Sequence, residues 1–411
     1  MQARSRGRNH TAAGSEGPSH CATGQGPGIR ARALSLRAFR ADLPAVCFAL
    51  IVPLLFLVGC SPRPGPELLL PAGTEAAPPA DARQVRVFMA TTRGASAEAP
   101  EIYNAERERE LSYSSFAISI PPGHQASEIE WPRAGAPDPA TDFVTTRRWA
   151  LDRKGFLSGL AAESKGKTDV VLYVHGYNTS AQEALYRAAQ ISVDAGSEGV
   201  PVVFTWPSNA QLTAYVSDRD AADFSRAYLA DLLTTLTRSR KIGRTVVVAH
   251  SMGGRLMMEA LVQLRLMGRR DVLDRLEVVL ADPDIDVDLF WEQARIVGKL
   301  TPPITVIVAP DDRALRASQF LAVGHDRIGK ADLTDPRYAE AATKFGVRLV
   351  DVTSLDTDTI AHSRIDQLAV LYNRLPASQQ RFGAGSLRGA GAFVFEAIGF
   401  GFTGIGQGLA R

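Results

Sequence analysis

The chain has 411 residues, of which 45% are hydrophobic and 22% are charged, and its formal net charge at pH 7 is +2. This length allows one large domain with extra segments at either end. Much of the basic excess lies in the first forty residues, which contain many arginines and a single acid, Glu16. The remainder has no basic stripe, so a nucleic-acid partner is not expected.

Cysteine is confined to the N-terminal part of the chain, at Cys21, Cys47 and Cys60. A disulfide framework or a cysteine metal site is therefore excluded for the folded domain that follows. No other feature of the sequence calls for a metal ion or an organic cofactor, and we expect none.

The N-terminal segment has the order of an export signal. Arginines at positions 30, 32, 37 and 40 precede an apolar run over 45–58, which ends in Leu57-Val58-Gly59-Cys60. The run is short for a membrane span and suits the apolar region of a signal peptide. Leu-Val-Gly-Cys resembles the bacterial lipobox, in which the cysteine receives a lipid and becomes the new N-terminus. We therefore expect lipidation at Cys60 and a place in the bacterial cell envelope, lipid-anchored to the membrane.

The chain divides into four predicted parts. A leader with the signal peptide spans 1–59, and the lipidated cysteine with a Pro- and Ala-rich tether spans 60–84. Such a composition is typical of a linker that packs no core. The folded domain is expected over 85–375, and a Gly-rich tail over 376–411.

Short apolar runs alternate with helical patterns through the domain. Strands are predicted at 85–90 and 116–120, forming an antiparallel start, and then at 170–174, 202–205, 245–249, 276–281, 304–309 and 347–352. The later runs are apolar throughout, as in a parallel sheet covered on both faces. Between them, apolar residues from Phe224 to Leu236 recur at spacings of three and four, as in an amphipathic helix. The pattern predicts an α/β fold with a mostly parallel, doubly wound sheet.

The strand 245–249 leads directly into His250-Ser251-Met252-Gly253-Gly254 and then a helical pattern. This strand, tight turn and helix form the context of a nucleophile elbow, which needs small residues two positions on either side of the serine. Ala249 and Gly253 meet that need. Ser251 is therefore the candidate nucleophile, and the Met252 N–H at the helix start is a candidate oxyanion donor.

A serine nucleophile needs a histidine base and an acid. Of the seven histidines, His325 and His362 alone follow the elbow, and His362 follows the last strand, where this fold places its base. The acid is expected after the strand 304–309, at Asp311 or Asp312. A second option is the group Asp282, Asp284 and Asp286, and capping or solvation is the ordinary fate of such aspartates.

The second oxyanion donor is expected from the loop after the first core strand. His175-Gly176-Tyr177-Asn178 begins this loop, and the Tyr177 N–H is the candidate donor, with Gly176 allowing the close turn. For His175 we prefer a structural hydrogen bond to a catalytic role.

These segments resemble a bacterial α/β-hydrolase family of unknown function. The likeness rests on His175-Gly176-Tyr177-Asn178, Phe204-Thr205-Trp206-Pro207-Ser208, Ala249-His250-Ser251-Met252-Gly253-Gly254, Ala281-Asp282-Pro283-Asp284-Ile285-Asp286 and Asp312-Arg313-Ala314-Leu315, with Ala90-Thr91-Thr92-Arg93, Tyr215 and Asp218. It runs from about Val85 to Asn373. The resemblance implies the α/β-hydrolase fold and favours Asp312 over Asp311 as the acid. Gly254 stands where the family often has Asn, which leaves the triad untouched.

Together these features predict a serine hydrolase that uses Ser251, His362 and Asp312 to cleave a small-molecule or lipid ester through an acyl-enzyme. The same triad also serves an acyltransferase or an amidase. A non-catalytic envelope scaffold that keeps this fold is the alternative from another class, because fold alone does not give function.

Overall fold

The computed structural model describes residues 63–353, apart from 74–76, 97–98, 100, 133–135, 165, 313, 316–317 and 319–324. The chain divides into two units, 1–62 and 63–411, and everything described here belongs to the second. Cys60, His362 and the Gly-rich tail lie outside the described residues.

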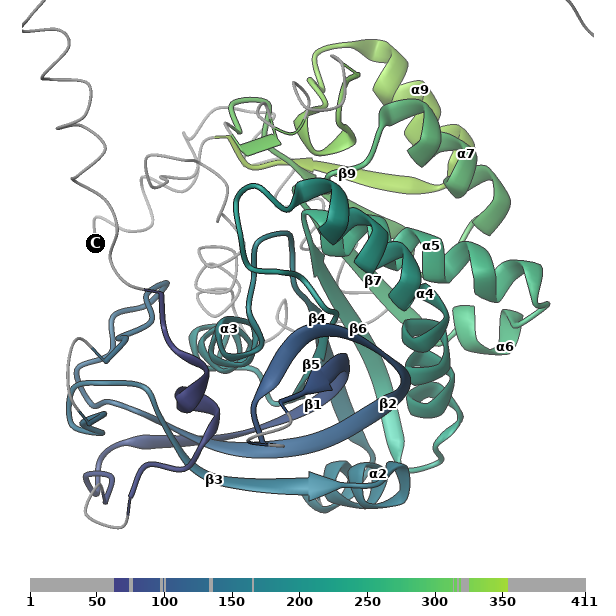
Figure 1. The fold of residues 1–411 in the computed structure, drawn as a ribbon. Helices are drawn as coiled ribbons and strands as arrows, with labels where there is room; N and C mark the ends of the chain where they lie inside the picture. Colours follow the sequence, from purple (N-terminus) through teal and green to yellow (C-terminus); the bar gives the residue numbers. More distant parts are fainter. Residues whose placement is uncertain are drawn as a thin grey trace, which may run out of the picture. The chain divides into compact units, whose positions relative to one another are not determined.

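One nine-stranded sheet forms the centre of this unit, in the order β3-β2-β1-β5-β4-β6-β7-β8-β9 (Figure 1). The strands are β1 (Arg83–Ala95), β2 (Tyr103–Ile120), β3 (Val144–Leu151), β4 (Thr168–Val174), β5 (Val200–Thr205), β6 (Ile242–His250), β7 (Leu276–Ala281), β8 (Ile304–Val308) and β9 (Val347–Asp351). β1, β2 and β3 pair antiparallel, and from β1 across to β9 neighbouring strands are parallel. The predicted antiparallel start and parallel sheet are confirmed.

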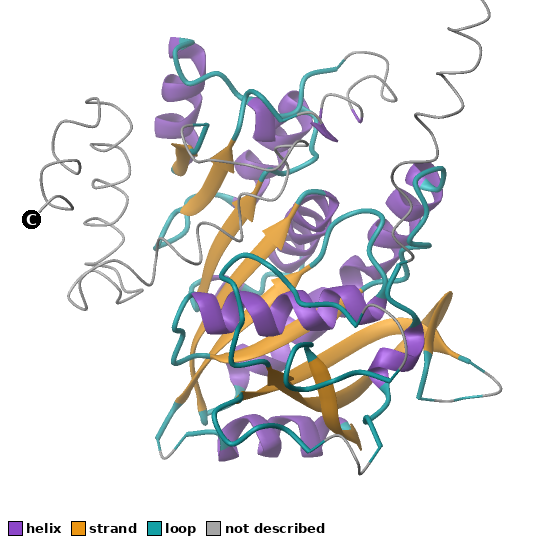
Figure 2. Cartoon of the chain, turned by 90° about the vertical axis from the view of Figure 1, so that its left-hand side faces the viewer, coloured by secondary structure: helices purple, strands orange, loops and turns teal. Residues whose placement is uncertain are grey.

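Helices cover both faces of the sheet (Figure 2). They are η1 (Pro66–Leu69), α2 (Arg153–Ala162), α3 (Ala181–Asp194), α4 (Tyr215–Arg238), α5 (Met252–Leu266), α6 (Arg270–Leu273), α7 (Val287–Val297), η2 (Ile328–Lys330) and α9 (Pro336–Phe345). One hydrophobic cluster joins the sheet to α2, α4, α5 and α7, and a second joins it to α3 and η1. Because both faces are covered, a central strand such as β5 is buried along its whole length.

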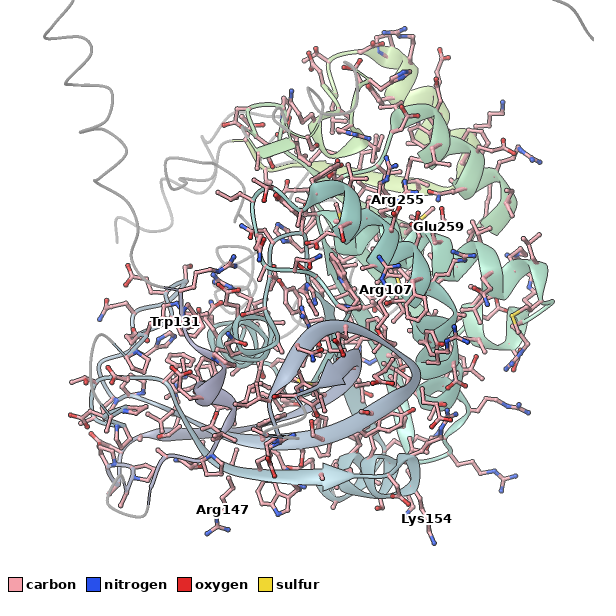
Figure 3. The ribbon with its side chains drawn as sticks, in the orientation of Figure 1. Arg107, Trp131, Arg147, Lys154, Arg255 and Glu259 are labelled. Carbon is pink, nitrogen blue, oxygen red and sulfur yellow. The ribbon has the colours of Figure 1, made fainter. Side chains whose placement is uncertain are left out.

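Strand β3 was not predicted, because it lies at the edge of the sheet and carries polar and exposed residues. Its Arg147 points away from the domain, as does Lys154 at the start of α2 (Figure 3). The helices α4 and α5 are joined by an ion pair of 3.0 Å between Arg255 and Asp223. No helix within the described ranges is both long enough and apolar enough to cross a bilayer.

The segment before β1 packs on the domain, which corrects the expectation of a tether for residues 63–73. Leu68 and Leu69 are buried in the cluster beneath α3. The Leu68 carbonyl accepts hydrogen bonds from the hydroxyls of Thr145 at 2.6 Å and Tyr186 at 3.1 Å. The surrounding prolines and alanines dominate the composition of this stretch, so two leucines are enough to dock it without changing the overall pattern.

A buried histidine ties the loop after β2 to the end of α3. The two ring nitrogens of His124 lie 2.8 Å from a Glu130 oxygen and 3.0 Å from an Asp194 oxygen, and the side chain is 3% exposed. Burial by itself lowers the pKa of His124, but the hydrogen bonds to Asp194 and Glu130 outweigh it, so the pKa is raised. The charged ring is therefore favoured between the two carboxylates.

Candidate active site

Those candidate residues that the structure describes lie at the carboxyl ends of the parallel strands. Ser251 follows β6, and its N–H donates to the Ala281 carbonyl at the end of β7, at 2.9 Å. The Asp282 N–H donates to Ile307 of β8 at 3.1 Å. Because these ends meet along one edge, residues from distant parts of the sequence become neighbours there, as is usual for binding sites of open α/β sheets.

Ser251 occupies a strained turn between β6 and α5. Its φ is 52° and its ψ is −120°, a conformation that residues other than glycine rarely adopt. The turn is held by hydrogen bonds that the Ser251 carbonyl accepts from the N–H groups of Gly254 at 2.9 Å and Asp284 at 3.1 Å. A Cβ on Gly253 would lie 2.4 Å from the His175 carbonyl oxygen, so only glycine fits there. Ser251 thus lies in a tight, strained turn between a strand and a helix.

The loop after β4 (residues 175–180, hereafter the β4 loop) lies against this serine. A Cβ on Gly176 would lie 3.1 Å from the Ser251 Cβ, so the absence of a side chain lets the loop approach. Within the described part of the chain, neither the Tyr177 N–H nor the Met252 N–H donates to a loop, turn or side-chain acceptor. Met252 directly follows the serine and begins α5, and Tyr177 directly follows Gly176, which packs against Ser251. A developing oxyanion needs donors of this kind.

His175 has a structural role, as preferred from the sequence. It is fully buried, its Nδ1 lies 2.8 Å from the Gly176 carbonyl, and its Nε2 lies 3.2 Å from the Trp206 backbone nitrogen. An N–H at Nδ1 and a bare Nε2 satisfy both contacts. Burial, with the nearby Arg93 charge, lowers the pKa of His175 to about 3. The ring is therefore neutral near pH 7.

Two buried charged residues, Arg93 and Asp218, hold the β4 loop in place by hydrogen bonds. Arg93 donates to the carbonyls of Thr179 at 2.7 Å and Ser208 at 2.9 Å. Asp218, at the start of α4, accepts from the Ser208 hydroxyl at 2.5 Å and from the Asn178 N–H at 3.3 Å. Burial lowers the pKa of Arg93 to about 10, which leaves it charged at neutral pH. The family resemblance includes both residues but gives neither of them a role. We infer that they position this loop.

A second link runs from α4 to the elbow. The Tyr215 hydroxyl donates to Asp284 at 2.8 Å, and Asp284 also accepts from the Ser318 hydroxyl at 2.8 Å and pairs with Arg327 at 3.2 Å. Burial, and then the Asp284 charge, raise the pKa of Tyr215, so its hydroxyl stays protonated. Since the Asp284 N–H holds the Ser251 carbonyl, this aspartate supports the elbow.

The two adjacent candidates for the acid have different environments. Asp312 is completely buried and Asp311 is exposed. Asp312 also accepts the Leu315 N–H at 2.9 Å, so it caps the turn that follows β8. A buried carboxylate that accepts a backbone N–H is held in one orientation, and an oriented carboxylate is what a histidine partner needs.

The other aspartates after β7 are engaged in the fold. Asp282 is buried with a φ of 45°. Asp286 caps α7 through the Leu289 N–H at 3.0 Å, and its other oxygen lies 3.4 Å from His325. Capping is the ordinary role that the sequence allowed for this group. His325 itself is largely exposed, with 70% of its side chain accessible.

His362 lies outside the described residues, and its position relative to Ser251 stays a prediction. The last described strand, β9, lies beside β8, and the Val352 N–H donates to the Val308 carbonyl at 3.1 Å. The chain therefore leaves β9 at the same edge as Ser251, next to the strand that leads to Asp312. This topology is consistent with a histidine base that follows β9.

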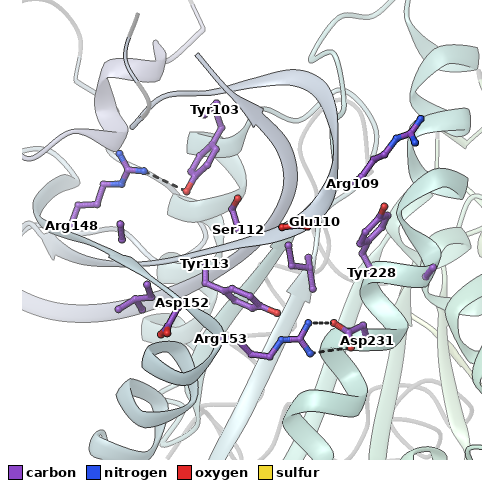
Figure 4. Close-up of a pocket in the computed structure, with 15 residues that line it drawn as sticks. Tyr103, Arg109, Glu110, Ser112, Tyr113, Arg148, Asp152, Arg153, Tyr228 and Asp231 are labelled. Atoms are coloured by element: carbon purple, nitrogen blue, oxygen red, sulfur yellow. Dashed lines mark hydrogen bonds and ion pairs between the residues drawn. The ribbon is translucent and has the colours of Figure 1, made fainter. Parts of the chain in front are cut away.

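A separate cavity of about 960 Å³ lies between β2, the end of β3, α2 and α4 (Figure 4). Its walls include the ion pair of Arg153 with Asp231 and the hydrogen bond of 3.4 Å from Arg148 to the Tyr103 hydroxyl. Neither Ser251 nor Asp312 lines it. In the described ranges, no group of three His, Cys, Asp or Glu residues is arranged to hold a metal ion.

Comparison with known proteins adds a family. A family described as alpha/beta hydrolase of unknown function matches residues 156–379, more than half of the chain. No curated protein sequence matches significantly.

Several solved structures match with low scores. An esterase from Pyrobaculum calidifontis is 13% identical over 87% of this chain and 92% of that one, with a TM-score of 0.30. Fungal esterases from Rhizomucor miehei give 12% identity over 82% and 91%, with a TM-score of 0.31. A siderophore hydrolase from Aspergillus nidulans gives 11% identity over 75% and 98%, with a TM-score of 0.34. Scores this low carry no argument about function.

Proposed function

The chain belongs to a family of α/β hydrolases of unknown function, and from this premise we propose that it is a serine hydrolase that cleaves carboxylic esters. The observation that carries the proposal is the conformation of Ser251. A non-glycine residue at a φ of 52°, between a strand and a helix, is backbone strain at the position where a nucleophile elbow needs it.

The proposed reaction proceeds through an acyl-enzyme. His362 removes the proton of the Ser251 hydroxyl as the oxygen attacks the ester carbonyl, and Asp312 stabilises the resulting imidazolium. The N–H groups of Met252 and Tyr177 bind the oxyanion. The tetrahedral intermediate expels the alcohol, which takes the proton from His362. Water then attacks the acyl-enzyme by the same route and releases the acid.

Labelling with a fluorophosphonate probe tests the assignment of the nucleophile. We expect the wild-type chain to be labelled and Ser251→Ala to be neither labelled nor active, with a loss in turnover on the order of a million-fold. Ser318→Ala is the matched control, since Ser318 is also buried at this edge of the sheet but is engaged with Asp284. Labelling of Ser251→Ala at the wild-type level would refute the assignment.

The same three residues could also serve two other activities, which must be distinguished from ester hydrolysis. An acyltransferase would pass the acyl group to an alcohol or amine in place of water, and an amidase would cleave the amide that matches the ester. A series of p-nitrophenyl esters of increasing chain length, with added acceptor alcohols and with matched anilides, separates the three by their products. A non-catalytic scaffold would leave the probe unreacted.

We also propose that Cys60 is lipidated and that the protein is anchored in the bacterial cell envelope. The support is the order of the basic residues, the apolar run and Leu57-Val58-Gly59-Cys60. Incorporation of labelled palmitate, and its loss in Cys60→Ala, tests this part of the proposal independently of any activity.

A further inference from the structure

Arg63 fastens the start of the described chain to the β4 loop. Its guanidinium pairs with Glu183 of α3 at 2.7 Å. It also donates to the Asn178 carbonyl at 2.6 Å, to the Asn178 side-chain oxygen at 2.7 Å and to the Ala210 carbonyl. A planar guanidinium that donates hydrogen bonds to a carboxylate and to oxygens of two loops fixes the positions of these groups relative to one another. Arg63 therefore holds together the β4 loop, α3 and the loop after β5 (residues 206–214, the β5 loop).

This contact lies next to the candidate active site. Asn178 directly follows Tyr177, the proposed oxyanion donor, and Gly176 packs against Ser251. Glu183 forms a capping box with Ser180 at the start of α3. The guanidinium of Arg63 thus contacts the β4 loop one residue away from the proposed donor.

The expected lipid anchor is separated from this contact by only a few residues of chain. Cys60 precedes Arg63 by three residues, and three residues of fully extended chain span at most about 10 Å. A lipid on Cys60 would therefore be inserted in a membrane whose surface cannot be far from the β4 and β5 loops. A long flexible tether would impose no such limit, but the docking of residues 63–73 removes most of the expected tether length.

Two strongly exposed apolar side chains lie in and just after the β5 loop, which Arg63 contacts. Leu212 in the β5 loop is 78% exposed and Val216 at the start of α4 is 63% exposed. The Tyr177 hydroxyl donates to the carbonyls of Gln211, at 3.3 Å, and Leu212, so the β5 loop is fastened to the β4 loop. Isolated exposed apolar residues are common, and the position beside the anchored segment is what distinguishes these two.

We propose that the β4 and β5 loops, with Leu212 and Val216 at their surface, dock on the lipid bilayer that holds the Cys60 anchor. Apolar side chains beside an anchor enter the boundary between head groups and acyl chains, and a second contact makes a single-anchor attachment stable. The edge of the sheet that carries Ser251 then faces the membrane. With the proposed hydrolase function, on which this last step rests, the substrate class is an ester with a long acyl chain, taken from the bilayer.

The test measures the depth of single positions in the membrane. The three natural cysteines lie at or before position 60, so the processed lipoprotein has no other free thiol. Leu212→Cys in the full chain is labelled with an environment-sensitive fluorophore and reconstituted in vesicles of phosphatidylethanolamine and phosphatidylglycerol, with and without nitroxide-labelled lipid. Val216→Cys provides a second position in case Leu212→Cys does not fold. Leu266→Cys is the matched control, because Leu266 is 74% exposed at the far end of α5, which begins beside Ser251 and runs away from it.

We expect nitroxide lipid to remove more than about half of the emission at 212 and 216, since a docked apolar face lies about 5–10 Å into the interface, and to leave position 266 unchanged. Equal quenching at 212 and 266, or none at either, overturns the proposal. A blue-shifted emission at 212 without quenching means that protein covers the loop, and it also overturns the proposal. Failure of Cys60 to take up palmitate also overturns the proposal, because the docking depends on the lipid anchor. Fluorophosphonate labelling reports the fate of the proposed function separately, because a dead site would still be quenched at position 212.

Discussion

Truncation of Leu69 to alanine measures whether the segment before β1 is part of the fold. Leu69 is completely buried in a cluster with Phe116, Ile118 and Phe143. A fully buried leucine replaced by alanine loses its transfer free energy and leaves a cavity, at a cost of about 2–5 kcal/mol in the free energy of unfolding. Leu70→Ala is the control, because Leu70 is the next residue and is only partly buried. We expect it to cost about 1 kcal/mol or less.

Both variants are compared by urea unfolding in an unlipidated Cys60→Ala background. If Leu69→Ala lowers the free energy of unfolding no more than Leu70→Ala does, residues 63–73 are a tether after all. A chain that begins at Val85 would lose more than one leucine, because the buried hydroxyls of Thr145 and Tyr186 would also lose the Leu68 carbonyl. Each unsatisfied group adds about 1–3 kcal/mol, so we expect this shorter domain to be unstable.

Three further predictions concern the acid, the anchor and a pH-dependent contact. Asp312→Asn should stay folded and lose roughly ten-thousand-fold in turnover, whereas Asp311→Asn should retain normal turnover, and reversed phenotypes in ester assays would move the acid to Asp311. Cys60→Ala should leave the membrane fraction in cell fractionation, and label from palmitate that persists on it would contradict lipidation there. His124 has a raised pKa, so its stabilising contribution is full below the ordinary histidine pKa of about 6.5 and is lost as the pH rises through the folded value. His124→Gln should therefore lower the free energy of unfolding more at pH 6 than at pH 9, and an equal loss at both would argue against a charged ring.

The sequence predicted those parts of the fold that have a strong local signal. The apolar runs at 276–281 and 304–309 coincide with β7 and β8 to within a residue, because strands buried on both faces are apolar throughout. The tight turn at Ser251 was predictable because it requires small neighbours at fixed positions. β3 was not, since an edge strand carries polar residues that resemble a loop.

The residues that support the site were less predictable, because their partners are distant in sequence. Arg63 is separated from Asn178 by 115 residues and from Ala210 by 147, and no spacing rule connects positions so far apart. Arg93 and Asp218 were contained in the family resemblance, but their joint burial under the β4 loop needed the fold to be known. An arginine within a Pro-rich stretch, followed by three leucines, is the one local signal that could have indicated docking.

The structure also bears on which histidine can serve as the base. Burial and the Arg93 charge hold His175 neutral, and both of its ring nitrogens are engaged with backbone groups. His124 is enclosed by two carboxylates at the end of α3. His325 pairs with Asp286, the residue that caps α7. The ring of His250 lies against Gly176, under the loop that supplies the proposed oxyanion donor. Each of these histidines has a structural environment of its own, so His362 stays the proposed base, and a His362→Ala variant that kept full esterase turnover would refute that proposal.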